Sequence, residues 1–243
     1  MYGKENPTFV DKVCAVWNYQ SEDDKLIRER QTFNHSDAFL RYIAMLLTVL
    51  ALFLYVENYQ EWYQAISFTA TMIFSYLLVQ GVERTSNFNL YMIRLWLLAL
   101  FVQIPFVILT ESIKLNGLFL LFAGALLVKG GVKYLPLYVL LIYLVPIHDV
   151  WIVAIIVPAW AIFKKYKVSV FTYMILFITV IMFGNEHLKY SYIFAIAFGA
   201  TLIEIVRLLK NQLQMIPLFK FPRKLYYYGY FIIITLAVLY KYL

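Results

Sequence analysis

The chain has 243 residues, of which 63% are hydrophobic and only 14% are charged, and its mean hydropathy is +0.73. Soluble globular domains carry about 25% charged residues, so this composition excludes a soluble domain and indicates a polytopic membrane protein. The net charge of +7 does not call for a nucleic-acid partner, because cytoplasmic loops of membrane proteins are enriched in Lys and Arg.

Residues 1–38 form a polar region of mixed charge ahead of the first hydrophobic run. Asn6-Pro7 is a typical start of a helix, with Pro in the first turn. Ser21 is a suitable N-cap for a second helix, which would begin with acidic residues and end with basic ones. We expect a cytoplasmic amphipathic region that anchors on the membrane surface, and a docking element for a partner protein is the alternative.

Residues 39–243 consist mainly of hydrophobic runs separated by short polar gaps. Backbone groups in a bilayer must be hydrogen bonded within their own segment, which favours helices over open sheets. The runs therefore predict an all-α transmembrane domain. About nine spans are expected, at about 39–56, 65–82, 89–110, 115–128, 133–147, 150–163, 168–184, 190–209 and 225–243.

The basic residues fall in alternate gaps between these runs. Only Lys114, Lys189 and Lys241 lie on the side opposite the N-terminal region. The positive-inside rule then places the N-terminus in the cytoplasm and the C-terminus outside. The runs at 133–147 and 150–163 are short for a hydrocarbon core of about 30 Å, so this pair is either two crossings or a partly re-entrant hairpin.

A few polar side chains lie inside the predicted spans, where each requires a reason. Arg94 either extends to the cytoplasmic surface or binds an anionic ligand. Gln103, two residues before Pro105, either satisfies backbone groups freed by the proline or lines a substrate cavity. Glu204 and Arg207 are three residues apart and are expected to pair.

Residues suited to catalysis or metal binding are few. The histidines are His35, His148 and His187, and no HxxH, HxH or HExxH spacing occurs, so we expect no metal site. His148 and Asp149 are a candidate general-base pair, although adjacent residues seldom pair with each other. The single Cys14 excludes an intrachain disulfide, and no Gly-rich phosphate loop or G-x-S-x-G turn is present.

The stretch Tyr76–Phe106, YLLVQGVERTSNFNLYMIRLWLLALFVQIPF, resembles the TraX family of conjugation-associated membrane acetyltransferases. The similarity extends over roughly residues 40–165, through the Arg41-Tyr42-Ile43-Ala44 start of the first span, the Leu115-Asn116-Gly117 segment and Asp149. The residues of the central block that match are Gly81, Thr85, Asn87, Tyr91, Arg94, Leu95, Ala99, Gln103, Pro105 and Phe106.

The resemblance implies a multi-pass protein of the bacterial plasma membrane that transfers acetyl from cytoplasmic acetyl-CoA to a peptide or pilin-like N-terminus. Acetyl-CoA would be its acyl donor, with no metal. Its partners would be membrane lipid and a small peptide or a second membrane protein, and no nucleic acid. The ligand-binding residues would be Arg41, Arg84, Asn87, Arg94, Gln103, Asn116 and Asp149, with the three arginines attracting the anionic donor.

The sequence departs from the family pattern where the family has histidines. Leu52 and Ile233 occupy the two main histidine positions, and Arg84 replaces a third. An aliphatic side chain cannot act as the general base that an imidazole supplies. Two interpretations follow: an acetyltransferase that uses another base, or a non-catalytic membrane partner, assembly factor or peptide-binding or transport component with the same fold. A transporter unrelated to this family is a further alternative.

Overall fold

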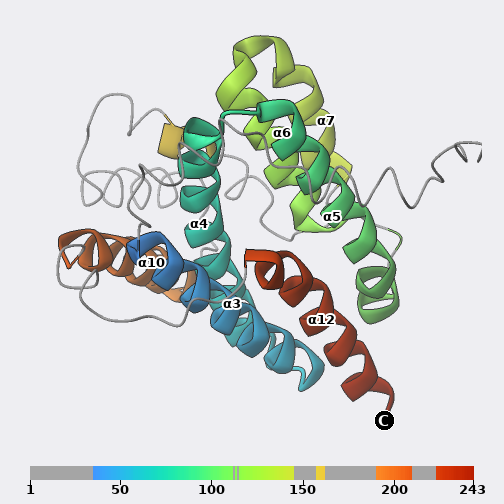
Figure 1. Cartoon of the computed structure of the whole chain (residues 1–243). Coiled ribbons are helices and arrows are strands. Elements are labelled where there is room, and N and C mark those ends of the chain that lie inside the picture. Colours follow the sequence, from blue (N-terminus) through green and yellow to red (C-terminus); the bar gives the residue numbers. More distant parts are fainter. Residues whose placement is uncertain (1–34, 112, 114, 145–156, 162–189, 210–222) are drawn as a thin grey trace, which may run out of the picture.

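The computed structural model (Figure 1) describes residues 35–111, 113, 115–144, 157–161, 190–209 and 223–243. All regular elements in these ranges are helical, which confirms the all-α prediction for this part of the chain. Residues 1–34, most of the predicted span at 150–163, the whole of the predicted span at 168–184, Cys14, His148, Asp149 and His187 lie outside it. The elements are α3 (His35–Val56), α4 (Gln60–Arg84), α5 (Phe88–Thr110), α6 (Gly117–Gly130), the 3₁₀ turn η1 (Gly131–Tyr134), α7 (Leu135–Leu144), α10 (Tyr190–Leu208) and α12 (Arg223–Tyr242).

Three of these helices are long and apolar enough to cross a membrane: Phe39–Val56, Glu61–Arg84 and Phe88–Thr110. They correspond to the first three predicted spans. The second is longer than predicted, since α4 begins at Gln60 rather than near residue 65. The helices at Gly117–Gly130 and Gly229–Tyr242 are apolar but shorter.

A tight turn joins α3 to α4. Asn58 adopts a left-handed conformation with φ 62°, which Asn tolerates better than most residues. The Tyr59 N–H donates to Leu54 O at 2.9 Å and the Asn58 N–H to Tyr55 O at 3.2 Å, the two hydrogen bonds of a Schellman motif. The motif satisfies the last carbonyls of α3 and turns the chain into α4.

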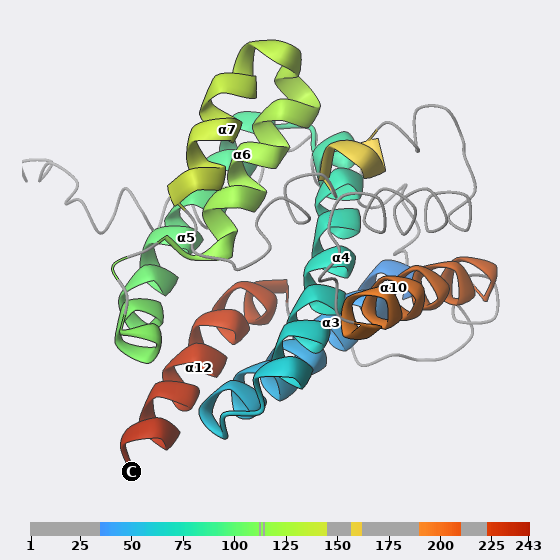
Figure 2. The same ribbon diagram turned by 180° about the vertical axis from the view of Figure 1, so that it is seen from behind.

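Long-range contacts set the directions of the helices. The ends of α3 and α12 meet where Phe53 and Tyr240 have ring centroids 5.9 Å apart, and the ends of α5 and α12 meet where Lys241 bonds Glu111. α3, α5 and α12 therefore end on one side, here called the Glu57 end (Figures 1 and 2). The opposite side, where α4 ends and α5 begins, is called the Arg84 end.

Helix α6 begins about half-way along α5 rather than beside its end. Asn116, the N-cap of α6, is hydrogen bonded to Ala99 and Gln103. The connection after Thr110 thus returns past the last turns of α5 before the next helix starts. With 14 residues, α6 is about 21 Å long, and it carries the chain back toward the Arg84 end.

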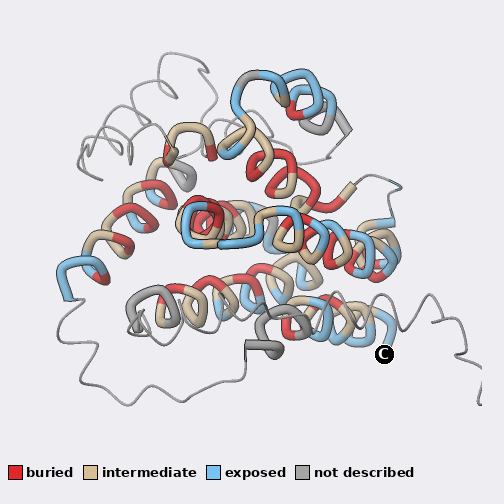
Figure 3. Tube along the Cα trace, turned by 45° about the horizontal axis from the view of Figure 1, so that its top comes forward, coloured by how far each residue is buried: buried red, intermediate tan, exposed pale blue. Residues whose placement is uncertain are grey.

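The core lies around α4 and α6, and Figure 3 shows buried and exposed turns alternating along the helices. Met72, Ile73 and Leu120 are fully buried within it. The short helix at 157–161 packs against α6 at Gly124, where an added Cβ would lie 2.8 Å from Val157 Cγ1. The close helix approach therefore favours glycine at this position.

Candidate functional site

The three arginines of the predicted anion site lie on three different helices. Arg41 is in the second turn of α3, Arg84 is the last residue of α4, and Arg94 is in the second turn of α5. Arg84 is exposed and donates to Gln80 Oε1 at 3.1 Å, whereas Arg41 and Arg94 are half-buried. The three arginines therefore all lie toward the Arg84 end. Arg41 and Arg94 are near the starts of their helices, and Arg84 is at the end of its own.

Asn87 has a structural role in the turn between α4 and α5. Its side-chain oxygen accepts from the Leu90 N–H at 3.0 Å and caps α5. Thr85 donates to Asn87 O at 3.3 Å. Tyr91 packs on Gly81, where an added Cβ would lie 3.0 Å from its hydroxyl oxygen. Four residues that carry the TraX resemblance thus build this turn, which gives them a role in folding.

Gln103 and Asn116, 13 residues apart, are brought into direct contact. Gln103 Oε1 accepts from the Asn116 backbone N–H and from Asn116 Nδ2, both at 2.9 Å. Asn116 Nδ2 also donates to Ala99 O at 2.8 Å, and its Oδ1 accepts from the Leu118 N–H at 3.0 Å. Asn116 is 1% exposed.

This amide pair closes the junction between α5 and α6. Gln103 Oε1 accepts two hydrogen bonds from Asn116, which ties the middle of α5 to the start of α6. The dipole at the start of α6 would favour an anion, but the Asn116 oxygen already occupies one of the N–H groups there. The geometry therefore fits a buried structural connection better than a ligand site.

Aliphatic residues occupy the positions where the family resemblance would place its histidines. Leu52 of α3 packs on the buried cluster of Leu98, Val102 and Ile234. Ile233, which precedes Ile234 in α12, is half-buried. The only histidine among the described residues is His35, at the first position of α3. Within the described ranges the surroundings of Leu52 between α3, α5 and α12 are thus mainly aliphatic and offer no imidazole.

Glu204 and Arg207 form the pair predicted from their spacing. Arg207 Nη1 lies 3.6 Å from Glu204 Oε2, with the arginine side chain 60% exposed and the glutamate 14%. The separation is an ion-pair contact that is too long for a hydrogen bond, and Glu204 Oε2 has no hydrogen-bond partner among the described residues. The prediction of a pair at the end of α10 is confirmed.

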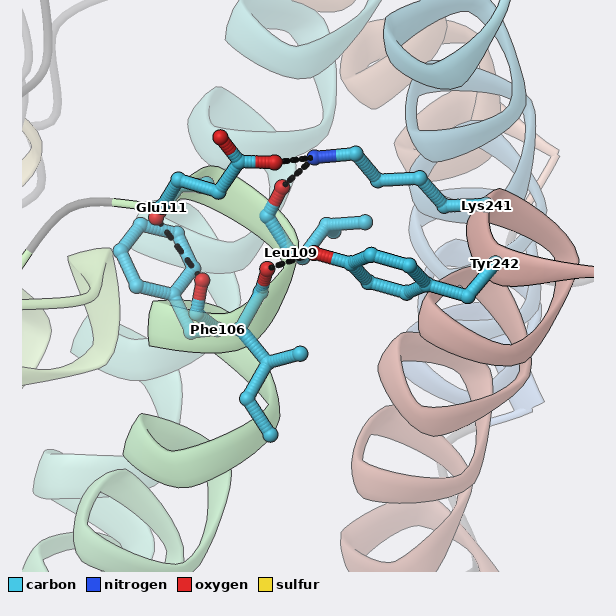
Figure 4. Close-up of polar contacts among 7 residues, drawn as sticks. Phe106, Leu109, Glu111, Lys241 and Tyr242 are labelled. Carbon is cyan, nitrogen blue, oxygen red and sulfur yellow. Dashed lines mark hydrogen bonds and ion pairs between the residues drawn. The ribbon is translucent and has the colours of Figure 1, made fainter.

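The residues at the end of α12 connect two other helices at the Glu57 end. Lys241 Nζ donates to Glu111 Oε1 at 2.7 Å and to Leu109 O at 2.9 Å, and Tyr242 donates to Ile108 O at 3.3 Å, as Figure 4 shows. Tyr240 donates to Glu57 Oε1 at 2.7 Å. These contacts form a C-terminal clamp that holds α12 against α3 and α5.

The hydrogen bond and the positive charge of Lys241 lower the pKa of the Glu111 carboxyl from its ordinary value. A favourable partner for the ionised form has this sign. The sequence placed Lys241 on the side opposite the N-terminal region but did not connect it to Glu111. Lys241 was the available signal, because it is one of only three basic residues predicted on that side.

No metal site is visible in the described part of the chain, where His, Cys, Asp and Glu do not form a group of three or more. Asp149 and His148, the candidate general-base pair, lie outside the described residues. Comparison with family models, curated proteins and solved structures finds no match for this chain. The TraX resemblance, its acetyl-CoA donor and its peptide or pilin-like acceptor therefore stay predictions.

Proposed function

We propose that this chain is a multi-pass protein of a bacterial plasma membrane, with about nine spans and a cytoplasmic N-terminus. Exposed apolar stripes support the membrane location. Leu46, Val49, Leu50 and Phe53 follow one another at helical spacing on α3 and are 44–69% exposed. A similar stripe runs along α5 from Ile93 to Ile108. Such faces are costly in water and are favourable against lipid.

The helix directions support the proposed topology. In a nine-span chain the first, third and ninth spans run outward and the second and eighth run inward. α3, α5 and α12 do end on one side. α4 runs back from the Glu57 end to the Arg84 end, as expected of the second span. The Glu57 end is then external and the Arg84 end cytoplasmic.

The single native cysteine makes this topology easy to test. In a Cys14→Ser background, a cysteine placed after Leu243 should react with a membrane-impermeant maleimide in intact cells, and Lys129→Cys should react only after the cells are opened. Labelling of both positions from the same side would overturn the proposed crossing pattern.

For its role, we propose a non-catalytic membrane partner or assembly component built on a TraX-like scaffold. The observation that carries this proposal is the apolar packing of Leu52 against Leu98, Val102 and Ile234. Acyl transfer to an amine needs a base close to neutral pKa, and no candidate lies in this cluster. The closed Gln103–Asn116 pair also supports a scaffold role, because its amide groups already bond to each other.

Acetyl transfer is the second candidate function, favoured by Arg41, Arg84 and Arg94 near the cytoplasmic ends of their helices. Guanidinium groups suit the phosphates of a CoA donor. Such a site would bind acetyl-CoA from the cytoplasm, with a base supplied by another residue.

One experiment separates the two functions. The purified full chain in detergent is given acetyl-CoA and peptides with free N-termini, and release of CoA thiol is measured beside an acetyl-CoA binding titration. The scaffold proposal expects no release above a detergent blank. Sustained release that is lost in Arg41→Ala would overturn it and establish an acetyltransferase. Binding that is lost in Arg41→Ala without turnover would indicate a scaffold that keeps a donor site.

A further inference from the structure

Two lysines project from the turn between α6 and α7. Lys129 is in the last turn of α6 and Lys133 is in η1, and both are exposed. Gly131, with φ +74°, reverses the chain between them, and an added Cβ there would have no neighbour within 4 Å. The turn is therefore open on its outer side.

The charge of this turn is not balanced by nearby acids in the sequence. No Asp or Glu occurs between Glu111 and Asp149. Lys133 Nζ lies 5.1 Å from the centre of the Tyr134 ring, and that ring packs against Gly130. The aromatic contact holds the ammonium group near the turn and leaves its charge in place.

An exposed apolar face begins directly after the lysines. Leu135, Leu137 and Leu140 of α7 are 44%, 38% and 56% exposed. A surface with two ammonium groups above an aliphatic face matches one ligand chemistry, an anionic headgroup attached to acyl chains. A free phosphate would use only the lysines, and a nucleic acid would leave the leucines in water.

We propose that the α6–α7 turn, through Lys129 and Lys133, binds an anionic phospholipid headgroup of the cytoplasmic leaflet, with the acyl chains lying along α7. This inference rests on the proposed membrane orientation and is independent of acetyl transfer. Basic groups at the cytoplasmic surface attract anionic lipid. In the α6–α7 turn, the two lysines and the leucines of α7 would hold the lipid at one defined position.

The test measures binding of phosphatidylglycerol and of phosphatidylcholine to the purified full chain by native mass spectrometry. The wild type should retain phosphatidylglycerol preferentially. Lys129→Gln with Lys133→Gln should weaken it by about fivefold per lysine, or about 25-fold together. The matched control is Lys114→Gln with Lys189→Gln, which removes the same charge on the predicted external side and should leave the preference unchanged.

Equal retention of phosphatidylglycerol by the wild type and the Lys129/Lys133 double variant would overturn the lipid site. So would an equal loss in the Lys114/Lys189 control, or displacement of the lipid by millimolar inorganic phosphate, which would indicate a simple anion site. Unchanged thermal midpoints show that the variants are folded. Extraction of the wild type from membranes by alkaline carbonate would instead contradict the membrane proposal itself, so the two failures are distinguishable.

Discussion

The α5–α6 junction and the C-terminal clamp both join helices through polar side chains, but in opposite surroundings. At the junction, Asn116 is 1% exposed and its side chain bonds Gln103, Ala99 and Leu118. At the clamp, the side chain of Glu111 is 68% exposed and that of Lys241 is 26% exposed. The first connection is neutral and buried, and the second is charged and largely in contact with solvent.

Burial determines how much each of these connections contributes to the stability of the fold. An unsatisfied polar group that is buried costs about 1–3 kcal/mol, whereas an exposed ion pair has water and salt as alternatives. A shorter distance does not make the stronger contribution: the Lys241–Glu111 bond is 2.7 Å and the Asn116–Gln103 bond is 2.9 Å. The buried Asn116–Gln103 bond is therefore expected to contribute more to stability than the exposed Lys241–Glu111 bond.

The largest expected effect is that of Asn116→Ala. The change removes the α6 cap and leaves Gln103 Oε1 and Ala99 O with fewer donors in a buried site. We expect a loss of about 3 kcal/mol in the free energy of unfolding, measured as a lower thermal midpoint in detergent.

Asn87→Ala is the matched control for this change, because Asn87 caps α5 through the same kind of bond at 3.0 Å but is exposed. Loss of the Asn87 cap should lower the free energy of unfolding by about 1 kcal/mol. Equal losses of stability in the two variants would show that burial of the α6 cap adds nothing to its contribution.

The next largest effect concerns the apolar cluster. Leu52→His places an imidazole against Leu98, Val102 and Ile234, three aliphatic side chains that cannot hydrogen bond to it. We expect destabilisation of about 2 kcal/mol and no release of CoA thiol. Leu52→Met, which keeps an apolar side chain of similar volume, should cost less than about 1.5 kcal/mol. Restored turnover in Leu52→His would show that the cluster is a vacant catalytic site.

A third change tests packing without polar groups. Gly124→Ala places a methyl group 2.8 Å from Val157 Cγ1. Overpacking of this kind costs about 1–3 kcal/mol, offset by about 1 kcal/mol from the better helix propensity of Ala. We expect a moderate fall in the thermal midpoint that Val157→Ala relieves in the double variant. Additive losses in the double variant would mean that α6 and the 157–161 helix do not press on each other.

The sequence predicted the parts of this fold that depend on local patterns. Continuous apolar runs indicated the helices of α3, α4 and α5 to within a few residues, because a segment of that hydropathy has few alternatives to a helix. The spacing of Glu204 and Arg207 predicted their pair because residues three apart are neighbours on the surface of a helix. The start of α4 was placed too late because Glu61 and Gln64 interrupt the apolar run.

The site was less predictable, because its residues meet through long-range packing. Gln103 and Asn116 were both noted as polar residues, but no periodicity indicates that α6 starts half-way along α5. The clamp joins residues that are up to 183 positions apart, and sequence spacing says nothing about such a pair. In the sequence, Leu52 indicated only that a histidine of the family pattern is absent. Its packing against the cluster that contains Ile234 became visible only in the folded structure.

The smallest expected effect is that of Lys241→Gln at the clamp. Glu111 has a lowered pKa in the folded protein because Lys241 bonds and attracts its ionised form. A lowered folded-state pKa gives stabilisation that is fully present above the ordinary pKa of the carboxyl and is lost as the pH falls through the lowered value. The thermal midpoint of the wild type should therefore exceed that of Lys241→Gln at neutral pH, by less than it exceeds that of Asn87→Ala.

The midpoints of the wild type and Lys241→Gln should converge in acid. High salt at neutral pH should also reduce the gap between them, since the ion pair is exposed. A gap that persists unchanged in acid would assign the stabilisation to the hydrogen bond from Lys241 to Leu109 O, a contact that does not titrate with Glu111.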